Sequence, residues 1–286
     1  MDGMPFPALE LLRCPVCRSG WDAKLSGDRV LLCVRGHRFD AARQGYVNFL
    51  TGRGTKFVPD SAEMVAARDR FLAAGHYGPI AAALASVCVG SLEHDDGGSP
   101  GAVLDAGAGT GYYLAAVLEK AADARAVALD LSKFALRRAA KLPRTAAVVW
   151  DVWRDLPLPD GAVDVVIDVF APRNFPEFGR VLRPGGVACI VTPLPEHLAA
   201  LRRILPMLDV PSGKAEGVIR AAGPQFEQIS VQELRFPLKL TREEAADLAV
   251  MGPAGHHSSR DAILARLDDE ALTADGAVEL TVLRRR

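Results

Sequence analysis

Four side chains near the N-terminus have the types and the spacing of a zinc site. Cys14 and Cys17 are separated by two residues, and Cys33 and His37 follow after a gap of fifteen residues. Two thiolates so close in the chain can hold one side of a tetrahedral ion, and the second pair supplies the two remaining ligands. Because four protein ligands leave no position for water or substrate, the pattern predicts a structural zinc ion. Metal binding would also supply folding free energy to a module too short for a large apolar core.

The competing interpretations of this cluster are a disulfide pair or four residues that are close by chance.

The chain shows no sign of export or membrane insertion. No charged leader with an apolar core precedes Cys14, and no apolar run approaches the length of a membrane span. We therefore expect a cytoplasmic protein with no membrane partner. In a reducing compartment these ligands favour metal over a disulfide. Cys88 and Cys189 lie in apolar stretches and are expected to be buried core thiols.

A second pattern is typical of a ligand-binding turn. The apolar run 102–104 ends at Asp105, and three alternate glycines follow, at Gly107, Gly109 and Gly111. Such a turn alone is weak evidence, because dinucleotide dehydrogenases and loops that bind nothing share it. A dehydrogenase turn would read Gly-x-Gly-x-x-Gly, whereas here an acid precedes the first glycine. That acid favours S-adenosylmethionine, whose ammonium group it attracts, over a pyrophosphate, which it would repel.

Two more acids follow apolar runs that are expected to be strands. Asp130 ends the second run and is placed to bind the two ribose hydroxyls of the cofactor. Asp151 ends the third run and is suited to accept a hydrogen bond from the adenine amino group, with Trp150 or Val152 packed on that ring. One acid at a strand end could be incidental. Three acids at three successive strand ends favour a cofactor site.

A parallel sheet is needed to bring these acids together. The apolar runs predict seven strands, at 102–104, 126–129, 146–150, 163–170, 186–192, 228–236 and 277–283. Helical patterns separate the first five strands, and further helices are expected over 61–92 and 241–251. The fold class is therefore α/β, a seven-stranded Rossmann-like class I methyltransferase sheet with a small N-terminal zinc-ribbon domain.

Length and composition fit one large domain and one small domain. The chain has 286 residues, of which 49% are hydrophobic and 24% charged. A formal net charge of −1 argues against nucleic acid as the substrate, but residues 1–56 hold nine Lys and Arg and only five Asp and Glu. The N-terminal module is thus the basic part of the chain, although an excess of this size also occurs on solvated faces.

Further segments accompany these two patterns along nearly the whole chain. They lie at 38–40, 44–48, 60–64 with Arg68, 71–77, 112–113, 170–172, 192–193 and 197–198. With them, the chain resembles the RlmA-type 23S rRNA (guanine-N1)-methyltransferases, a family that includes resistance enzymes from macrolide-producing bacteria. The resemblance implies three parts: a zinc-binding RNA-recognition module over 1–56, a helical connector and linker over 57–100, and an S-adenosylmethionine-dependent methyltransferase domain over 101–286.

The resemblance also implies a cofactor, a partner and site residues. S-adenosylmethionine and one structural zinc ion are the expected cofactors, and 23S rRNA is the expected partner, with a homodimer as a candidate assembly. The substrate would be a guanine, nucleotide 748 or 745, in the domain II hairpin that lines the peptide exit tunnel, with macrolide resistance as one consequence. Tyr77 and His197 would lie beside the cofactor, with the turn Gly109, Thr110, Gly111 and Tyr112 around its methionine part. The candidate phosphate contacts are Arg13, Arg18, Arg29, Arg35, Arg38 and Arg43.

Two departures from the family pattern bear on the substrate. Arg173 follows the Ala-Pro pair at 171–172, and small residues with paired histidines occupy 252–257. His256 and His257 could approach RNA, but adjacent histidines without cysteine or acid neighbours more often belong to a solvated loop.

Transfer to guanine N1 requires that its proton leave, so a base or a polarising group is needed. The Asn-Pro-Pro-Tyr motif of amino methyltransferases is absent from 170–173, which disfavours transfer to an exocyclic amine. We assign no catalytic residue, because His197 is better suited to orient the cofactor and Asp168 is expected to be buried. Phe170, Tyr112 or Tyr113 could stack on the unstacked guanine.

Two alternative functions remain open. One is a small-molecule methyltransferase whose zinc ribbon contacts proteins, which the near-neutral total charge allows. The other is a non-catalytic RNA-binding protein that keeps the cofactor as a structural ligand. The intact Asp105 and Asp130 argue against the second alternative, and the basic N-terminal module argues against the first.

Overall fold

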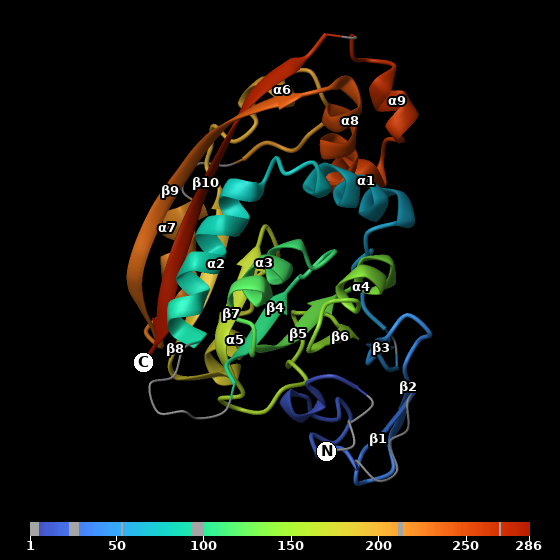
Figure 1. The fold of residues 1–286 in the computed structure, drawn as a ribbon, viewed down its shortest axis with the longest axis vertical. Helices are drawn as coiled ribbons and strands as arrows, with labels where there is room; N and C mark the ends of the chain where they lie inside the picture. The colour runs from blue at the N-terminus through green and yellow to red at the C-terminus, as the bar shows by residue number, and fades with distance from the viewer. Residues whose placement is uncertain (1–5, 23–28, 53, 93–99, 211–213, 269) are drawn as a thin grey trace.

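The computed structural model describes residues 6–22, 29–52, 54–92, 100–210, 214–268 and 270–286. Within these residues, one sheet of eight strands crosses the molecule in the order β3-β6-β5-β4-β7-β8-β10-β9 (Figure 1). The strands are β3 (Tyr46–Asn48), β4 (Ala102–Ala106), β5 (Arg125–Asp130), β6 (Thr145–Val149), β7 (Val163–Val169), β8 (Leu182–Pro193), β9 (Phe226–Leu240) and β10 (Leu272–Arg285). All pair in parallel except β10, which is antiparallel to both β8 and β9.

The seven strands from β6 to β9 confirm the predicted methyltransferase sheet, and β3 is an eighth strand that the sequence analysis did not place there. β3 is only three residues long, too short to show an alternating pattern, and its parallel pairing with β6 depends on tertiary packing. β9 and β10 are also longer than expected. Their antiparallel ladder runs from Leu272 opposite Leu240 to Arg285 opposite Phe226, so it continues past the apolar part of each strand.

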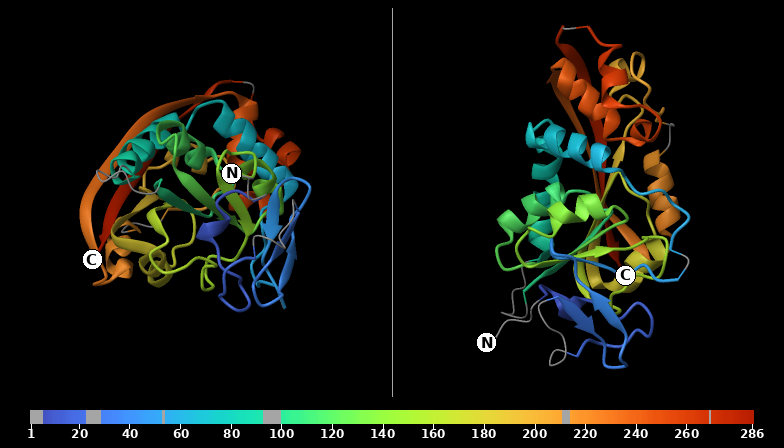
Figure 2. Two further views of the ribbon diagram at one scale, coloured as in Figure 1. Left: turned by 60° about the horizontal axis from the view of Figure 1, so that its bottom comes forward. Right: turned by 90° about the vertical axis from the view of Figure 1, so that its right-hand side faces the viewer.

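Helices cover both faces of the sheet (Figure 2). One face packs against α1 (Ala62–Ala73), α2 (Gly78–Leu92), α3 (Tyr112–Lys120), α4 (Lys133–Ala139) and α8 (Arg242–Val250). The other face packs against α5 (Phe175–Val181), α7 (Lys214–Ala222) and the N-terminal module. Short helices η1 (Leu9–Leu11), α6 (Ala199–Arg202), η2 (Pro253–His256) and α9 (Arg260–Leu264) join these elements.

The helical stretch expected over 61–92 is two helices at 82° to each other. α1 begins after Ser61, whose side chain accepts a hydrogen bond from the Met64 N–H, and the chain turns at Gly75, which has a φ of +83°. The helix expected over 241–251 is confirmed as α8. It begins with a capping box between Thr241 and Glu244.

The N-terminal module is built into the core of the large domain. Its two-stranded sheet, β1 (Val30–Leu32) and β2 (Arg38–Asp40), leads to β3 at the edge of the main sheet. Phe49, just after β3, is fully buried and stacks on Trp21 with 5.4 Å between ring centroids. Glu10 pairs with Arg125 of β5 at 2.7 Å. The apolar core on this face therefore continues from the module into the sheet.

Much of the predicted linker, residues 93–99, lies outside the described residues. Among the described residues, no single helix is long and apolar enough to cross a membrane. The bent pair α1 and α2 passes that test only jointly, on length and composition.

Candidate active site and metal centre

The four predicted zinc ligands converge. Two tight turns present them, and each turn uses a left-handed residue, Arg18 with a φ of +61° and Gly36 with a φ of +86°. The four ligand atoms of Cys14, Cys17, Cys33 and His37 all lie within 4.8 Å of one another.

The spacing of these ligand atoms fits a tetrahedral ion. The Sγ atoms of Cys17 and Cys33 are 3.7 Å apart, and Cys33 Sγ is 3.3 Å from Nδ1 of His37. An ion about 2.3 Å from each sulfur in tetrahedral geometry separates two sulfurs by about 3.8 Å. The His37 N–H also donates to Cys33 Sγ at 3.2 Å, which stabilises a thiolate. Four protein ligands make the ion structural, as the spacing predicted.

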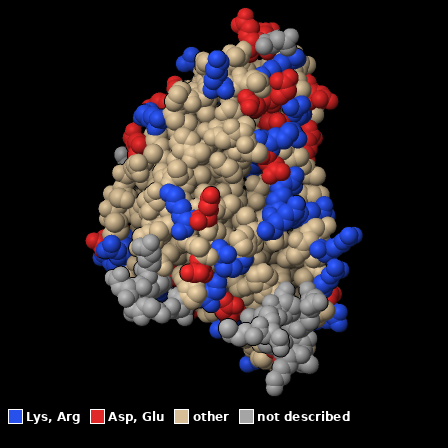
Figure 3. Space-filling model, viewed as in Figure 1, with Lys and Arg blue, Asp and Glu red and all other residues tan. Residues whose placement is uncertain are grey.

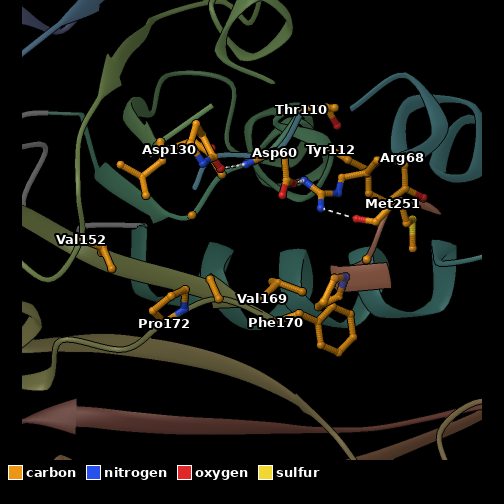
Figure 4. A pocket seen from close by; sticks show the side chains of 18 of the residues that line it. Asp60, Arg68, Thr110, Tyr112, Asp130, Val152, Val169, Phe170, Pro172 and Met251 are labelled. Carbon is orange, nitrogen blue, oxygen red and sulfur yellow. Dashed lines mark hydrogen bonds and ion pairs between the residues drawn. The ribbon is translucent and has the colours of Figure 1, made fainter. Parts of the chain in front are cut away.

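The second site is a cavity of about 560 Å³ at the carboxyl ends of the parallel strands. Nine of the ten predicted cofactor residues line it: Tyr77, Asp105, Gly107, Gly109, Thr110, Tyr112, Asp130, Asp151 and His197. In Figure 4, Asp130, Asp60, Arg68 and Thr110 lie along one side of the cavity, and Val152, Pro172, Val169 and Phe170 lie across from them. The strand ends thus bring together residues from five segments far apart in the sequence.

Asp105 combines an unpartnered carboxylate oxygen with a place in the cavity lining, whereas Asp168, whose two oxygens are also unpartnered, lies outside the lining. The side chain of Asp105 is 3% exposed, and Oδ2 has no hydrogen-bond partner among the described residues. Burial, with a contribution from the charge of Asp130, raises the pKa of Asp105 well above its usual range. A cation beside this carboxylate restores the charged form and pairs the orphaned oxygen. The ammonium group of S-adenosylmethionine is such a cation, so the site fits this cofactor.

The two other acids are held by hydrogen bonds. Asp130 accepts from the Gly109 N–H at 2.9 Å and from the Ser132 N–H at 2.7 Å. Asp151 accepts from the Trp153 N–H at 3.1 Å, and from the hydroxyl of Thr55 at 2.7 Å. Each carboxylate has a fixed orientation toward the cavity and keeps lone pairs for ribose hydroxyls or an amino group.

Glycine is needed at two positions of the turn for different physical reasons. Gly107 has a φ of +86°, and a Cβ atom there would lie 2.5 Å from Cβ of Ala171. Gly111 does not line the cavity. It precedes α3 with a φ of +82°, and a Cβ atom would lie 2.8 Å from Leu142. Gly107 therefore allows the turn to pack closely against Ala171, whereas Gly111 is required for the start of the helix.

Tyr77 and His197 form one hydrogen-bonded pair in the cavity wall. The Ala277 N–H donates to Nδ1 of His197 at 3.1 Å, and Nε2 lies 3.2 Å from the Tyr77 hydroxyl. Because Nδ1 accepts, the neutral ring carries its proton on Nε2 and donates it to Tyr77. Burial, with a contribution from Arg202, lowers the pKa of His197 to about 4. At neutral pH the ring therefore has no free lone pair for a substrate proton, and it positions Tyr77.

The three aromatic candidates for stacking differ in exposure. Phe170 is 42% exposed and lines the cavity, in a left-handed conformation with a φ of +56°. Tyr112 and Tyr113 also line it, but they are half-buried and pack edge to face at 5.2 Å. Asp168 is fully buried, as expected, and burial raises its pKa well above the usual range; the structure also places it outside the cavity lining.

The sequence analysis missed the part of the connector that closes the cavity. Residues 57–60 line it, and Asp60 pairs with Arg68 at 2.6 Å. Arg68 also donates to the Met251 carbonyl at 2.7 Å, which ties the connector to α8. His256 lines the cavity too, with Nε2 3.9 Å from Asp60, whereas His257 does not. Asp60 lies before the first residue of α1, so the helical spacing within α1 does not predict its pairing with Arg68.

The arginines of the N-terminal module are not equally available. Arg18 pairs with Asp155, and Arg38 donates twice to Asp40, at 3.0 and 3.1 Å. Arg29, Arg35 and Arg43 are exposed, and no carboxylate among the described residues pairs with them. These last three remain the better candidates for phosphate contacts.

Sheet order, glycine turn and three strand-end acids define a class I S-adenosylmethionine-dependent methyltransferase. Two family models match: a methyltransferase domain over residues 103–186, and the N-terminal zinc ribbon of RlmA over residues 12–52. A solved structure, the YcgJ protein of Bacillus subtilis, shares the fold with a TM-score of 0.50 and 16% identity. That match covers 71% of this chain and 98% of YcgJ.

Two relatives match over most of their length. The 23S rRNA (guanine(748)-N1)-methyltransferase of Streptomyces fradiae is 44% identical, over 90% of this chain and 89% of that protein. A protein of Micromonospora griseorubida, provisionally named 23S rRNA (guanine-N1)-methyltransferase, is 47% identical, over 96% of this chain and 97% of its own. The chain belongs to the RlmA-type 23S rRNA (guanine-N1)-methyltransferase family.

Loss of one zinc ligand should affect the whole chain. In Cys33→Ala, we expect the zinc content to fall from one ion per chain to none, measured by elemental analysis. The thermal midpoint should fall by roughly 10 °C, because several kcal/mol are lost and each shifts a chain of this size by about 2–4 °C. Cys88→Ala, in the apolar core, is the control and should keep its zinc. Zinc retained by Cys33→Ala would contradict the ligand assignment.

Removal of the charge of Asp105 should weaken cofactor binding. We expect Asp105→Asn to raise the dissociation constant for S-adenosylmethionine by roughly 10- to 100-fold, because a charge-assisted hydrogen bond contributes about 1.5–3 kcal/mol. Titration calorimetry measures this constant. Asp168→Asn is the matched control, a buried acid outside the cavity lining, and should bind normally. Equal weakening in both variants would mean that burial, not position, accounts for the effect.

Proposed function

We propose that this chain transfers the methyl group of S-adenosylmethionine to N1 of a guanine in the domain II hairpin of 23S rRNA. The observation that supports the proposal most strongly is the cavity, which is lined both by acids from three strand ends and by the exposed ring of Phe170. Family membership supplies the substrate class, and the name of the Streptomyces fradiae relative favours nucleotide 748 over 745.

The residues of this chain would act mainly by positioning. S-adenosylmethionine supplies an electrophilic methyl group when bound. Asp105 would hold its ammonium group, Asp130 its ribose and Asp151 its adenine, which fixes the cofactor along the strand ends. Phe170 lies at the end of β7, with its ring centroid 5.7 Å from that of His197 and 6.1 Å from that of Tyr77. Tyr77 and His197 thus support the Phe170 ring, and a guanine could stack on its exposed face.

The proton of guanine N1 must leave during transfer, and we assign no side chain to accept it. His197 is unsuitable, because Ala277 occupies Nδ1 and the proton of Nε2 points to Tyr77. Asp60 lines the cavity but is held by Arg68. The chain would then favour the reaction through alignment of the methyl group with N1, with the proton passing to solvent or RNA.

The remaining proposals concern the cell and the assembly. We place the enzyme in the cytoplasm, with residues 1–56 as its RNA-recognition module, 57–100 as connector and linker, and 101–286 as its methyltransferase domain. A homodimer is a candidate assembly, for which the outer strand β9 offers the exposed Ile229 and Val231. Light scattering measures this state.

The direct test is methylation of unmodified 23S rRNA. Purified protein and labelled S-adenosylmethionine are incubated with the rRNA, and primer extension maps the product, because it stops at N1-methylguanine. A single stop at 748 or 745 in the domain II hairpin supports the proposal and identifies the nucleotide. The drug sensitivity of a strain that expresses the chain then tests macrolide resistance.

The same assay separates the alternatives. Cofactor binding without label uptake by rRNA would support a non-catalytic RNA-binding protein. Methylation of small metabolites in a ribosome-free extract, with none of rRNA, would support a small-molecule methyltransferase. Label uptake by rRNA without a stop in the domain II hairpin would move the target elsewhere.

Phe170 should be needed for substrate binding and not for cofactor binding. We expect Phe170→Gly to raise the KM for rRNA by roughly 5- to 150-fold, since base stacking on an aromatic ring contributes about 1–3 kcal/mol. Glycine accepts the φ of +56° without strain, so the fold should be kept. Phe170→Tyr keeps the ring and should behave like the wild type. A normal KM for Phe170→Gly would exclude stacking at this position.

A further inference from the structure

α4 and its flanks form the most one-sided charge cluster near the cavity. Residues 131–145 include five cations, Lys133, Arg137, Arg138, Lys141 and Arg144, and no acid. These cations are separate from the candidate phosphate contacts predicted from the sequence, all of which lie in the N-terminal module. Figure 3 shows Lys and Arg gathered on the side of the molecule where α4 lies in Figure 1.

Two of the five cations have a hydrogen-bonding or ion-pair partner, and the other three have no carboxylate partner among the described residues. Arg138 pairs with Asp69 at 2.8 Å, and Arg144 donates to the Ala124 carbonyl at 2.9 Å. No carboxylate among the described residues pairs with the other three, Lys133, Arg137 and Lys141. Lys133 and Lys141 are exposed, and Arg137 is half-buried.

Phe134 holds two of the free cations in place. The Lys133 Nζ atom lies 5.3 Å from the centre of its ring, and the Arg137 guanidinium lies 5.1 Å from it. Such contacts orient a cation without neutralising it. The positive charge on this side of α4 is therefore both ordered and available to a polyanion.

The cluster lies between the cavity and the zinc module. At its start, the Ser132 N–H donates to Asp130 and the Ser132 hydroxyl donates to the Asp60 carbonyl. At its end, a Cβ atom on Gly45 would lie 3.6 Å from Cβ of Ala140, so the loop before β3 packs against the end of α4. Arg43 is exposed in that loop.

The nearby acids do not cancel this charge. Asp69 is paired with Arg138, and Asp60 is paired with Arg68. Asp130 already accepts two backbone N–H groups inside the cavity wall. A chain with a net charge of −1 thus has an unneutralised basic surface beside its active site.

We propose that Lys133, Arg137 and Lys141, with Arg43 beside them, form an α4 basic surface that binds RNA phosphates next to the target guanine. This inference rests on the proposed function. The surface connects the zinc module to the cavity, so one nucleic acid could contact both while a base enters the cavity. Phosphate contacts of this kind set the position of RNA and carry no sequence information.

The test removes the three free cations of the large domain. In Lys133→Ala/Arg137→Ala/Lys141→Ala, we expect the KM for a domain II hairpin RNA to rise roughly 10- to 100-fold at moderate salt. The slope of log affinity against log salt should become shallower by about 2, because each lost phosphate contact removes about 0.7–0.9. The kcat at saturating RNA and the dissociation constant for S-adenosylmethionine should not change.

A control with the same loss of charge is available at the opposite edge of the sheet. Arg203→Ala/Arg220→Ala/Lys239→Ala removes three exposed cations near α6, α7 and β9, and should leave KM and salt slope unchanged. Because Arg137 is half-buried, Lys133→Gln/Lys141→Gln serves as a second variant that alters only exposed positions. Its slope should become shallower by about two thirds of the change expected for the triple variant, because it removes two of the three cations.

The outcomes separate this inference from the proposed function. A normal KM and salt slope in both α4 variants, with wild-type methylation intact, would overturn the α4 basic surface alone. If the control variant raised the KM by the same amount, the effect would be due to total charge, and the α4 basic surface would also be overturned. If wild-type protein binds the hairpin without methylating it, the proposed function fails, while a shallower slope in the α4 variants still supports the surface.

Discussion

The parallel pairing of β4, β5 and β6 is the constraint on which the cofactor site depends. Parallel strands end at the same edge of a sheet, so the acids that end or follow them come to line one cavity. The glycine turn continues this pairing beyond β4, because the N–H groups of Gly107 and Ala108 both donate to the Leu129 carbonyl. The Gly109 N–H then reaches Asp130. The turn and the second acid are thus held by the same ladder that forms the sheet.

Asp105 shows what this arrangement costs. A buried carboxylate without a partner is unfavourable, and burial accordingly raises its pKa. The same isolation makes the carboxylate favour a cation, because an opposite charge stabilises the buried ionised form more than a neutral donor does. Asp168 is equally buried but lies outside the cavity lining. Comparison of these two acids separates the effect of burial from the effect of position.

A single chain segment links the zinc module to the wall of the cavity. β3 extends the main sheet beside β6, and the chain then passes over the cavity, where Thr55 donates to Asp151 and Asp60 pairs with Arg68. An RNA held by the module would therefore contact a segment that also forms the cofactor wall. A zinc ion bound by the module would stabilise this segment indirectly, because the module shares its apolar core with the sheet.

The candidate zinc ligands, the glycine turn, the three candidate acids and the class of the sheet could all be predicted from the chain alone, because each depends on local spacing or on continuous apolar runs. Which side chains contact one another across the fold could be seen only in three dimensions. The proton positions of His197 depend on Ala277, the closure of the cavity depends on Arg68, and the eighth strand depends on β6. Such contacts join residues that are far apart in the sequence and are not related by the spacing of a helix or a strand. They follow from the packing of whole elements, which no local pattern records.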